Sequence, residues 1–377
     1  MDLSNVLIVH ETEASARLRL VEHGYSPEIA AEIAVYLGQS TDLPDFVDDI
    51  ASALRADNLA VEFVELDRLL DRLPDYSALK ARTIIWSVTD GIRYYRGSTV
   101  SALSRLSGFA CFGAPARAQH LCQDKFATLA LAAAAGLRLA PTLLLEGTDE
   151  VAALGDWLHA KGPFFVKPNT LGAKIGIFAD SRCADLAQAR QCAQRLWTRY
   201  RDRSLIQTYV EGDDVRVSFM DTGGSLADQL GIDQLIGNAG SESGGAFMTM
   251  KDNETLSGAR DTHGRRGAFG AGREAAFVPR MIDLRTAGDA RSRAAVAEIL
   301  GMTGRMARLA GLRDYFSMDF RIAGDGTATF FEFEVCPAVT IYDFQAYLQM
   351  LHGLSLGGAL ARALRISFGR SHSINEA

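Results

Sequence analysis

The first part of the chain alternates short apolar runs with amphipathic stretches. Residues 6–10 and 83–88 are strand-length and mostly apolar, whereas residues 60–66 alternate apolar and polar positions. The first two patterns are typical of buried strands, and the third is typical of a half-buried strand. Residues 46–54 carry apolar side chains at helical spacing. Strands that alternate with helices favour an α/β layer with a parallel sheet, so we predict a first domain over residues 1–115.

Beyond residue 115 the pattern changes between helical and strand periods, without an internal repeat. Helical spacing predicts helices over residues 119–135, 149–160, 183–200, 289–311 and 343–366. Strands are predicted at both ends of residues 163–179 and over residues 142–145, 204–210 and 213–220. Residues 223–272 hold twelve of the 35 glycines, which is typical of a long functional loop. We predict a central unit over residues 116–205 and a C-terminal unit over residues 206–377.

The composition excludes several classes of protein. With 48% hydrophobic and 23% charged residues, the chain is too apolar to be mainly disordered. No apolar run approaches the roughly 18 residues of a transmembrane helix, and the net charge of −7 argues against a nucleic-acid partner. The start lacks the basic stretch of a signal peptide, and five cysteines without a C-x-x-C pair fit reduced thiols. We therefore expect a cytoplasmic protein without membrane or nucleic-acid partners.

A predicted β-hairpin near the C-terminus carries three carboxylates. Asp325-Gly326 separates two alternating runs, as a two-residue turn would, and this turn puts Asp319 opposite Glu332 with Glu334 on the same face. The aromatic residues of the hairpin are expected on the other face, in the core: Phe320, Phe331 and Phe333. Facing carboxylates are destabilising without a cation, and Mg²⁺ prefers such oxygen ligands. A solvated outer face is the alternative, and a turn shifted by one residue would break the pairing.

A second candidate site is the loop that follows the apolar run at residues 163–166. Lys167-Pro168 precedes small, polar and glycine-bearing residues that extend to Gly176 and include Lys174. Small residues let backbone N–H groups approach phosphate oxygens, and lysine supplies a point charge. The loop is not a P-loop, because the G-x-x-x-x-G-K-[ST] pattern is absent. Taken alone, an ordinary hairpin with a surface lysine is the simpler interpretation.

Taken together and in this order, these segments resemble the ATP-grasp superfamily and, within it, the D-alanine–D-alanine ligase branch. The resemblance covers about two thirds of the chain, from residue 90 to residue 345. It rests on four segments, which are residues 123–141, 165–176, 206–217 and 332–340. The resemblance implies an α/β (α+β) architecture, the ATP-grasp fold, in which an N-terminal parallel domain precedes two α+β subdomains that clasp ATP.

The resemblance also implies roles for individual residues. Lys125 and Lys167 would contact the phosphates of ATP, and the loop that contains Gly172 would fold over them. Asp214 would bind the ribose hydroxyls. The strand beside adenine would consist of Gln207, Thr208, Tyr209 and Val210. The ligands of two Mg²⁺ ions, with Mn²⁺ as the alternative metal, would be Asp319, Glu332 and Glu334.

The chain departs from the ligases that it resembles at several positions. They have an arginine where this chain has Ser317. We therefore expect the catalytic cations to be Arg280, Arg321 and Lys174. Glu334 stands where those ligases have an asparagine, an exchange that is common in the superfamily.

These features predict an ADP-forming ligase that joins a carboxylate to an amine through an acyl phosphate. The substrates would be amino-acid-like small molecules, residues 169–174 and 237–272 would form the lid, and the likeness to dimeric ligases implies a homodimer. One alternative is an authentic D-alanine–D-alanine ligase of cell-wall synthesis, against which Ser317 counts. The first domain also lacks the expected glycine-rich opening, although Glu11 and Glu13 follow the first strand. A nucleotide-binding protein without catalysis is the other alternative.

Overall fold

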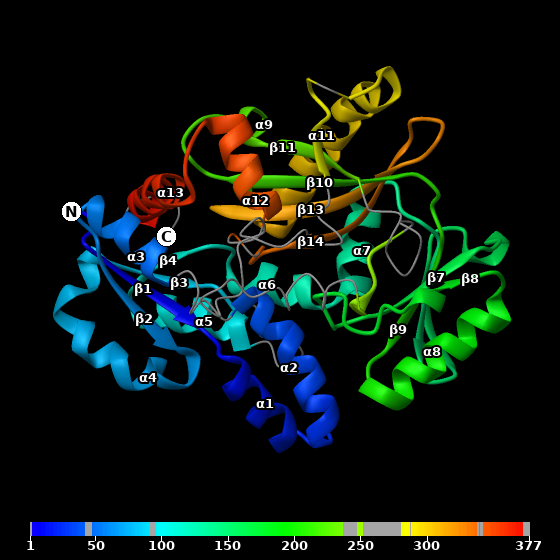
Figure 1. Cartoon of the computed structure of the whole chain (residues 1–377), viewed down its shortest axis with the longest axis horizontal. Helices are drawn as coiled ribbons and strands as arrows, with labels where there is room; N and C mark the ends of the chain where they lie inside the picture. Colours follow the sequence, from blue (N-terminus) through cyan, green and yellow to red (C-terminus); the bar gives the residue numbers. More distant parts are fainter. Residues whose placement is uncertain are drawn as a thin grey trace, which may run out of the picture.

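The computed structural model describes residues 2–41, 47–89, 96–236, 247–251, 280–286, 288–337, 339 and 342–371. The described chain forms three sheets, one parallel and two antiparallel, with helices on their faces (Figure 1). This is the mixed α/β architecture that the sequence predicts. Within the described part of the chain, no helix has the length and apolar character needed to cross a membrane.

The first sheet is parallel and has the strand order β2-β1-β3-β4. Its strands are β1 (Asn5–His10), β2 (Ala60–Glu65), β3 (Thr83–Ser87) and β4 (Ala110–Phe112). Both inner strands are apolar because both faces of the sheet are covered. The covering helices include α3 (Val47–Ala56), α4 (Leu69–Arg72), α5 (Arg96–Leu106) and the C-terminal α13 (Leu356–Ser371). The three strands predicted before residue 90 are confirmed.

The C-terminal helix packs on this first sheet. Leu360 and Leu364 of α13 are fully buried and belong to the same core as Ile8 and Trp86. The predicted helix over residues 343–366 is interrupted in the structure. It is divided into α12 (Tyr342–Tyr347), a π-helical turn (Leu348–His352) and α13. Gly353, with a φ of 61°, ends the π-helical turn, which is the left-handed conformation that favours glycine.

The central sheet is antiparallel and has the strand order β6-β5-β9-β7-β8. Its strands are β5 (Thr142–Glu146), β6 (Asp149–Leu154), β7 (Phe164–Pro168), β8 (Arg182–Cys183) and β9 (Ser204–Thr208). One face packs on α8 (Leu186–Tyr200) and on the hairpin of α1 (Glu13–Glu22) and α2 (Pro27–Thr41). The boundary expected after residue 205 falls inside β9, so the three-unit division stays a prediction.

Two predicted helices in this region are wrong in detail. Residues 149–154 form the edge strand β6 rather than the start of a helix, because Gly147 (φ 62°) reverses the chain and β5 supplies the hydrogen bonds. The helix predicted over residues 119–135 is two helices, α6 (Ala116–Gln123) and α7 (Lys125–Ala134). Asp124 separates them and caps α7 by accepting a hydrogen bond from Ala127 N.

The C-terminal sheet is antiparallel and has the strand order β12-β11-β10-β13-β14. Its strands are β10 (Asp213–Met220), β11 (Gly231–Ile236), β12 (Arg280–Asp283), β13 (Tyr315–Ile322) and β14 (Ala328–Glu334). The long α11 (Ala290–Ala310) covers one face and ends at Gly311 with a φ of 72°, which confirms the helix predicted over residues 289–311. The short α9 (Leu226–Gln229) precedes β11.

The hairpin of β13 and β14 differs from its predicted register near the turn. Ile322 pairs with Ala328, one residue away from the expected partner, and a bulge after Asp319 restores the predicted pairing of Asp319 with Glu332. The bulge inserts one extra residue into β14. Phe331, expected in the core, consequently lines the pocket beside Glu332, whereas Phe330 is fully buried in its place.

A buried hydrogen bond joins the first and the C-terminal sheets, and it provides a test of their contact. Trp86 Nε1 donates to the Tyr315 hydroxyl at 2.9 Å, and the Tyr315 ring stacks on Phe112. Tyr315→Phe leaves the indole N–H buried without its acceptor, so the free energy of unfolding should fall by about 1–3 kcal/mol. Urea denaturation of the variant and the wild type measures this difference.

Trp86→Phe supplies the matched background for this test. Tyr315→Phe should cost less there, because the N–H that needs the hydroxyl is gone. An equal cost in both backgrounds would contradict the contribution of the hydrogen bond.

Candidate functional site

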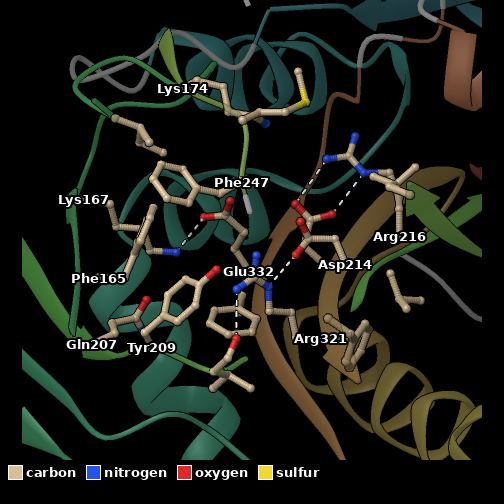
Figure 2. Close-up of a pocket in the computed structure, with 18 of the residues that line it drawn as sticks. Phe165, Lys167, Lys174, Gln207, Tyr209, Asp214, Arg216, Phe247, Arg321 and Glu332 are labelled. Atoms are coloured by element: carbon tan, nitrogen blue, oxygen red, sulfur yellow. Dashed lines mark hydrogen bonds and ion pairs between the residues drawn. The ribbon is translucent and has the colours of Figure 1, made fainter. Parts of the chain in front are cut away.

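A pocket lies between the central and the C-terminal sheets (Figure 2). Strands β7 and β9 line it on one side, and β10, β11, β13 and β14 line it on the other. Phe247 and Met248, which follow the undescribed part of the glycine-rich loop, complete its wall. Most of the predicted binding residues line this pocket: Lys167, Lys174, Gln207, Thr208, Tyr209, Val210, Asp214, Asp319, Arg321 and Glu332.

Two lysines from separate segments meet one carboxylate at one end of the pocket. Lys167 Nζ lies 3.5 Å and Lys125 Nζ lies 3.9 Å from Glu332 Oε2. Lys167 belongs to β7, Lys125 to the first turn of α7, and Glu332 to β14. These ion pairs therefore bridge the central and the C-terminal sheets, and Figure 2 shows Lys167 pointing at Glu332.

The close approach of these charges shifts their pKa values. Burial lowers the pKa of Lys167, against the opposing effect of the Glu332 carboxylate. Burial alone would raise the pKa of Glu332, but Lys167, Lys125 and Lys174 outweigh it and lower this pKa to about 2. The carboxylate is thus held ionised although its side chain is mostly buried, because three cations surround it.

A hydrogen-bond network fixes Lys125 against the loop after β7. Asn169 Oδ1 accepts from Phe126 N at 2.9 Å, and Asn169 Nδ2 donates to Asp124 Oδ1 at 3.1 Å. Lys125 Nζ donates to the Leu171 carbonyl at 2.9 Å. The break between α6 and α7, which the sequence analysis did not predict, therefore orients Lys125 toward Glu332.

Asp202 holds the lysine loop in place, and the sequence analysis missed it. Its buried carboxylate accepts hydrogen bonds from Thr170 N at 2.9 Å, Thr170 Oγ1 at 2.8 Å and Leu171 N at 3.3 Å. The loop then turns through Ala173 and Lys174, which have φ values of 50° and 65°. Asp202 lies 35 residues from Lys167 in the sequence, so no local pattern could have connected the two.

Arg216 is the second functional candidate that the sequence analysis missed. Its guanidinium binds Asp319 through two hydrogen bonds, of 3.0 and 3.1 Å, and lies 3.6 Å from Glu334 Oε2. Arg216 pairs directly with Asp319 across β10 and β13, and only 8% of its surface is exposed. The fold thus supplies a cation to two of the three carboxylates, Asp319 and Glu334. The alternation of β10, which puts Arg216 on the face of Asp214, was the signal that could have found it.

The three predicted metal ligands lie on one face, but cations separate them. Glu332 faces the two lysines, and Arg216 lies beside Asp319 and Glu334. In the described part of the chain, no group of three or more His, Cys, Asp or Glu side chains is arranged to hold a metal ion. Glu332 Oε2 is nevertheless buried and accepts no hydrogen bond from the described residues. An oxygen in this state fits a magnesium ion whose other ligands are phosphate oxygens.

The other end of the pocket is aromatic. The rings of Phe165 and Tyr209 lie 6.1 Å apart, and Phe247 meets Phe165 edge-on at 5.1 Å. Arg321 stacks on Tyr209 at 4.8 Å and binds Asp214 at 2.6 Å and the Val210 carbonyl at 2.8 Å. These contacts hold Arg321 at the aromatic end of the pocket.

Several predicted residues lie outside this pocket or outside the described residues. The side chain of Arg280 is not described, although its backbone begins β12. Most of the lid predicted over residues 237–272 is likewise outside the described residues. Gly172 follows Leu171 in the loop that Asp202 holds. Glu11 is buried directly after β1, where it accepts a hydrogen bond from Thr89 Oγ1 and pairs with Arg19.

Comparisons with known proteins agree with the resemblance stated from the sequence. No family model matches the chain. It is 26% identical over 155 residues to a D-alanine–D-alanine ligase of Gloeobacter violaceus, a match that covers 41% of this chain and 47% of the relative. A D-alanine–D-alanine ligase of Geobacter sulfurreducens is 26% identical over 129 residues, 34% of this chain and 39% of the relative. The chain spans less than half the length of these curated relatives.

Solved structures match the whole described architecture. A D-alanine–D-alanine ligase from Bacillus anthracis has a TM-score of 0.62 and 12% identity, with 98% of each chain covered. The VanG D-Ala:D-Ser ligase from Enterococcus faecalis has a TM-score of 0.61 and 11% identity, with 97% of this chain and 99% of that chain covered. The ATP-grasp fold predicted from the sequence is therefore confirmed, as is the resemblance to the D-alanine–D-alanine ligases.

The shifted pKa of Glu332 predicts how the stability of the unliganded protein depends on pH. A carboxyl group with a pKa of about 2 in the folded chain and 4.5 when unperturbed stabilises the fold fully above pH 4.5. This contribution is lost as the pH falls through 4.5 toward 2. The unfolding free energies of the wild type and Glu332→Gln should therefore converge between pH 6 and pH 3, as urea denaturation at each pH would measure. Parallel pH profiles would contradict the effect of the lysines.

Proposed function

We propose that the chain is an ATP-dependent ligase that joins a carboxylate to an amine and releases ADP and phosphate. The main support is the convergence of Lys125 and Lys167 on Glu332 at one end of a pocket whose other end is aromatic. A triphosphate needs concentrated positive charge, and a nucleobase needs flat apolar contacts. The likeness to D-alanine–D-alanine ligases in sequence, and the fold that it shares with one solved as a complex with ATP, point to the same nucleotide.

The proposed reaction has two steps. A carboxylate oxygen of the first substrate attacks the γ-phosphorus of ATP, the bond to the bridging oxygen breaks, and ADP leaves. The amine of the second substrate then attacks the acyl carbon, loses a proton and displaces phosphate. The first step brings anions together, so it needs cations that are already in place before the reaction. Lys125, Lys167 and Lys174 supply them, and Asp202 keeps the lysine loop in position.

The carboxylates suit a divalent cation as the remaining source of charge. Glu332 and Asp319 would hold Mg²⁺ or Mn²⁺, with Glu334 beside them, and one or two ions fit this donor set. The bound ion would neutralise charge on the phosphates. In its absence the lysines and Arg216 hold these carboxylates in place, so the site would be preorganised before the nucleotide binds.

The ligases that the chain resembles have an arginine at the position of Ser317. We propose that Arg216 supplies this positive charge instead. Ser317 is small and donates a hydrogen bond to Glu334 Oε2 at 3.0 Å. Ser218 pairs with Ser317 in the sheet, so Arg216, two residues along β10, approaches the same carboxylates from the neighbouring strand. Arg280 and Arg321 are then not needed for this task, and Arg321 instead supports the aromatic end through Asp214.

The substrates and setting of the reaction follow from the same proposal. The carboxylate and the amine would be small, amino-acid-like molecules, because D-alanine and D-serine ligases share the fold. All five cysteines are free thiols, which supports the reducing cytoplasm as the location. We also propose that the protein forms a homodimer and has no nucleic-acid partner. Dialanine synthesis itself is the narrower alternative, which Ser317 makes less favourable.

Removing the phosphate-end cation tests the proposed reaction. Lys167→Met should lower ADP release from Mg-ATP by about 10²-fold, because a buried cation near the transferred phosphoryl group is lost. The matched control is Lys161→Met, at an exposed lysine six residues earlier, which should behave as the wild type. The assay measures ADP with D- and L-amino acids singly and in pairs. ADP release that does not require a pair of substrates, or that is unchanged in Lys167→Met, would contradict the proposed ligase reaction.

An exchange of positions tests the role of Arg216. Arg216→Ser should lower ADP release by about 10²-fold, since Asp319 and Glu334 would lose the cation beside them. Adding Ser317→Arg restores a guanidinium on the adjacent strand and should recover part of the lost rate. If the double variant is no more active than Arg216→Ser, with both variants folded by circular dichroism, then Arg216 does not replace the expected arginine.

A further inference from the structure

The aromatic end of the pocket contains one buried side-chain amide. Gln207 lies at the centre of the central sheet, where it pairs with Thr142 of β5 on one side and Phe165 of β7 on the other. Only 1% of its surface is exposed, and it lines the pocket. Figure 2 shows it beside Phe165 and Tyr209. Because Phe165 and Lys167 lie two residues apart on one strand face, this amide is about 7 Å along the sheet from the phosphate end.

The orientation of the Gln207 amide is set by a relay of hydrogen bonds. The Thr142 hydroxyl donates to the Ala140 carbonyl at 2.8 Å, which uses its single proton. Thr142 Oγ1 can then only accept, and Gln207 Nε2 donates to it at 2.9 Å. Reversing the amide would put Gln207 Oε1 against this oxygen and would remove the bond to the buried Ala140 carbonyl. The amide nitrogen therefore faces Thr142, and the amide oxygen faces away from it.

The amide oxygen is the group left for a ligand. Among the described residues, none donates a hydrogen bond to Gln207 Oε1. The neighbouring backbone donors are already used, because Thr208 N donates to the Pro141 carbonyl at 3.0 Å and Tyr209 N to the Pro163 carbonyl at 2.9 Å. This edge of the pocket consequently offers an acceptor where a freely rotating glutamine would offer a donor or an acceptor.

We propose that Thr142 is a positioning residue that makes the pocket select nucleotides with an amino group on the base. With its amide fixed, Gln207 accepts a hydrogen bond from a 6-amino purine, and a 6-oxo purine places two acceptors against each other. An unpaired acceptor pair in a buried site costs more than a lost contact. This inference rests on nucleotide binding in the proposed function. It adds Thr142, which does not touch the base, as a second residue that determines the selection between 6-amino and 6-oxo purines.

The test compares ATP with ITP, because ITP has an oxo group in place of the 6-amino group of the purine ring and, with it, a proton on N1. Displacement of a fluorescent ATP analogue in the presence of Mg²⁺ gives both dissociation constants without requiring catalysis. The wild type should bind ATP at least about tenfold more tightly than ITP. In Thr142→Val the amide is free to rotate, so the preference should fall below about threefold.

Gln207→Glu provides the matched variants. A carboxylate has only acceptors and no orientation to fix, so Gln207→Glu alone and together with Thr142→Val should keep the preference of about tenfold or more. The double variant also shows that the valine is tolerated in the folded protein. A wild type that binds ATP and ITP equally, or a Thr142→Val variant that keeps the full preference, would overturn the inference.

The outcome separates this inference from the proposed function. If neither nucleotide displaces the analogue at millimolar concentration, nucleotide binding itself is refuted and the inference fails with it. If both nucleotides displace it with equal affinity, the nucleotide site stands and only the assignment of Thr142 is refuted.

Discussion

The pocket depends on neutralising three carboxylates that lie close together on the hairpin of β13 and β14. Glu332, Asp319 and Glu334 occupy neighbouring positions on one sheet face, and such a group is unstable unless cations reach it. Each cation comes from another segment: Lys167 from β7, Lys125 from α7 and Arg216 from β10. The central and C-terminal sheets are thus joined by electrostatics at the point where the pocket opens between them.

This arrangement explains why residues far from the pocket matter to it. Lys125 is directed by the break at Asp124, and the lysine loop is held by Asp202 at the end of α8. The hairpin of α1 and α2 packs with α8 on the face of the central sheet that is turned away from the pocket, through residues such as Leu20 and Ile33. The first forty residues therefore support the central-sheet side of the pocket, although the strand that they contain belongs to the parallel sheet.

The sequence predicted the fold and much of the pocket because their signals are local. Apolar runs marked the buried strands. The Asp-Gly turn predicted the hairpin, although the pairing of Asp319 with Glu332 is restored by a bulge after a register shift near the turn. The predictions failed where contacts between residues far apart in the sequence determine the local structure. The edge strand β6 has helix-forming residues but is paired with β5, and the bulge that turns Phe331 into the pocket is visible only in the pairing of β13 with β14. Asp202 lies in an ordinary loop pattern, so only its hydrogen bonds to the lysine loop distinguish it. For Arg216 the alternation of β10 is a sequence signal, but its role follows only from its contact with Asp319.

The return of α13 to the first sheet has a consequence for how the chain is made. Trp86 and Ile8 share their core with Leu360, Leu364 and Phe368. During synthesis the first hundred residues leave the ribosome long before these helix residues exist, and domains usually fold in that order. Here the core around the first sheet stays incomplete, with apolar surface uncovered, until residues 360–368 have been translated. The nascent chain must therefore remain soluble over more than three hundred residues of synthesis without the helix that completes this core.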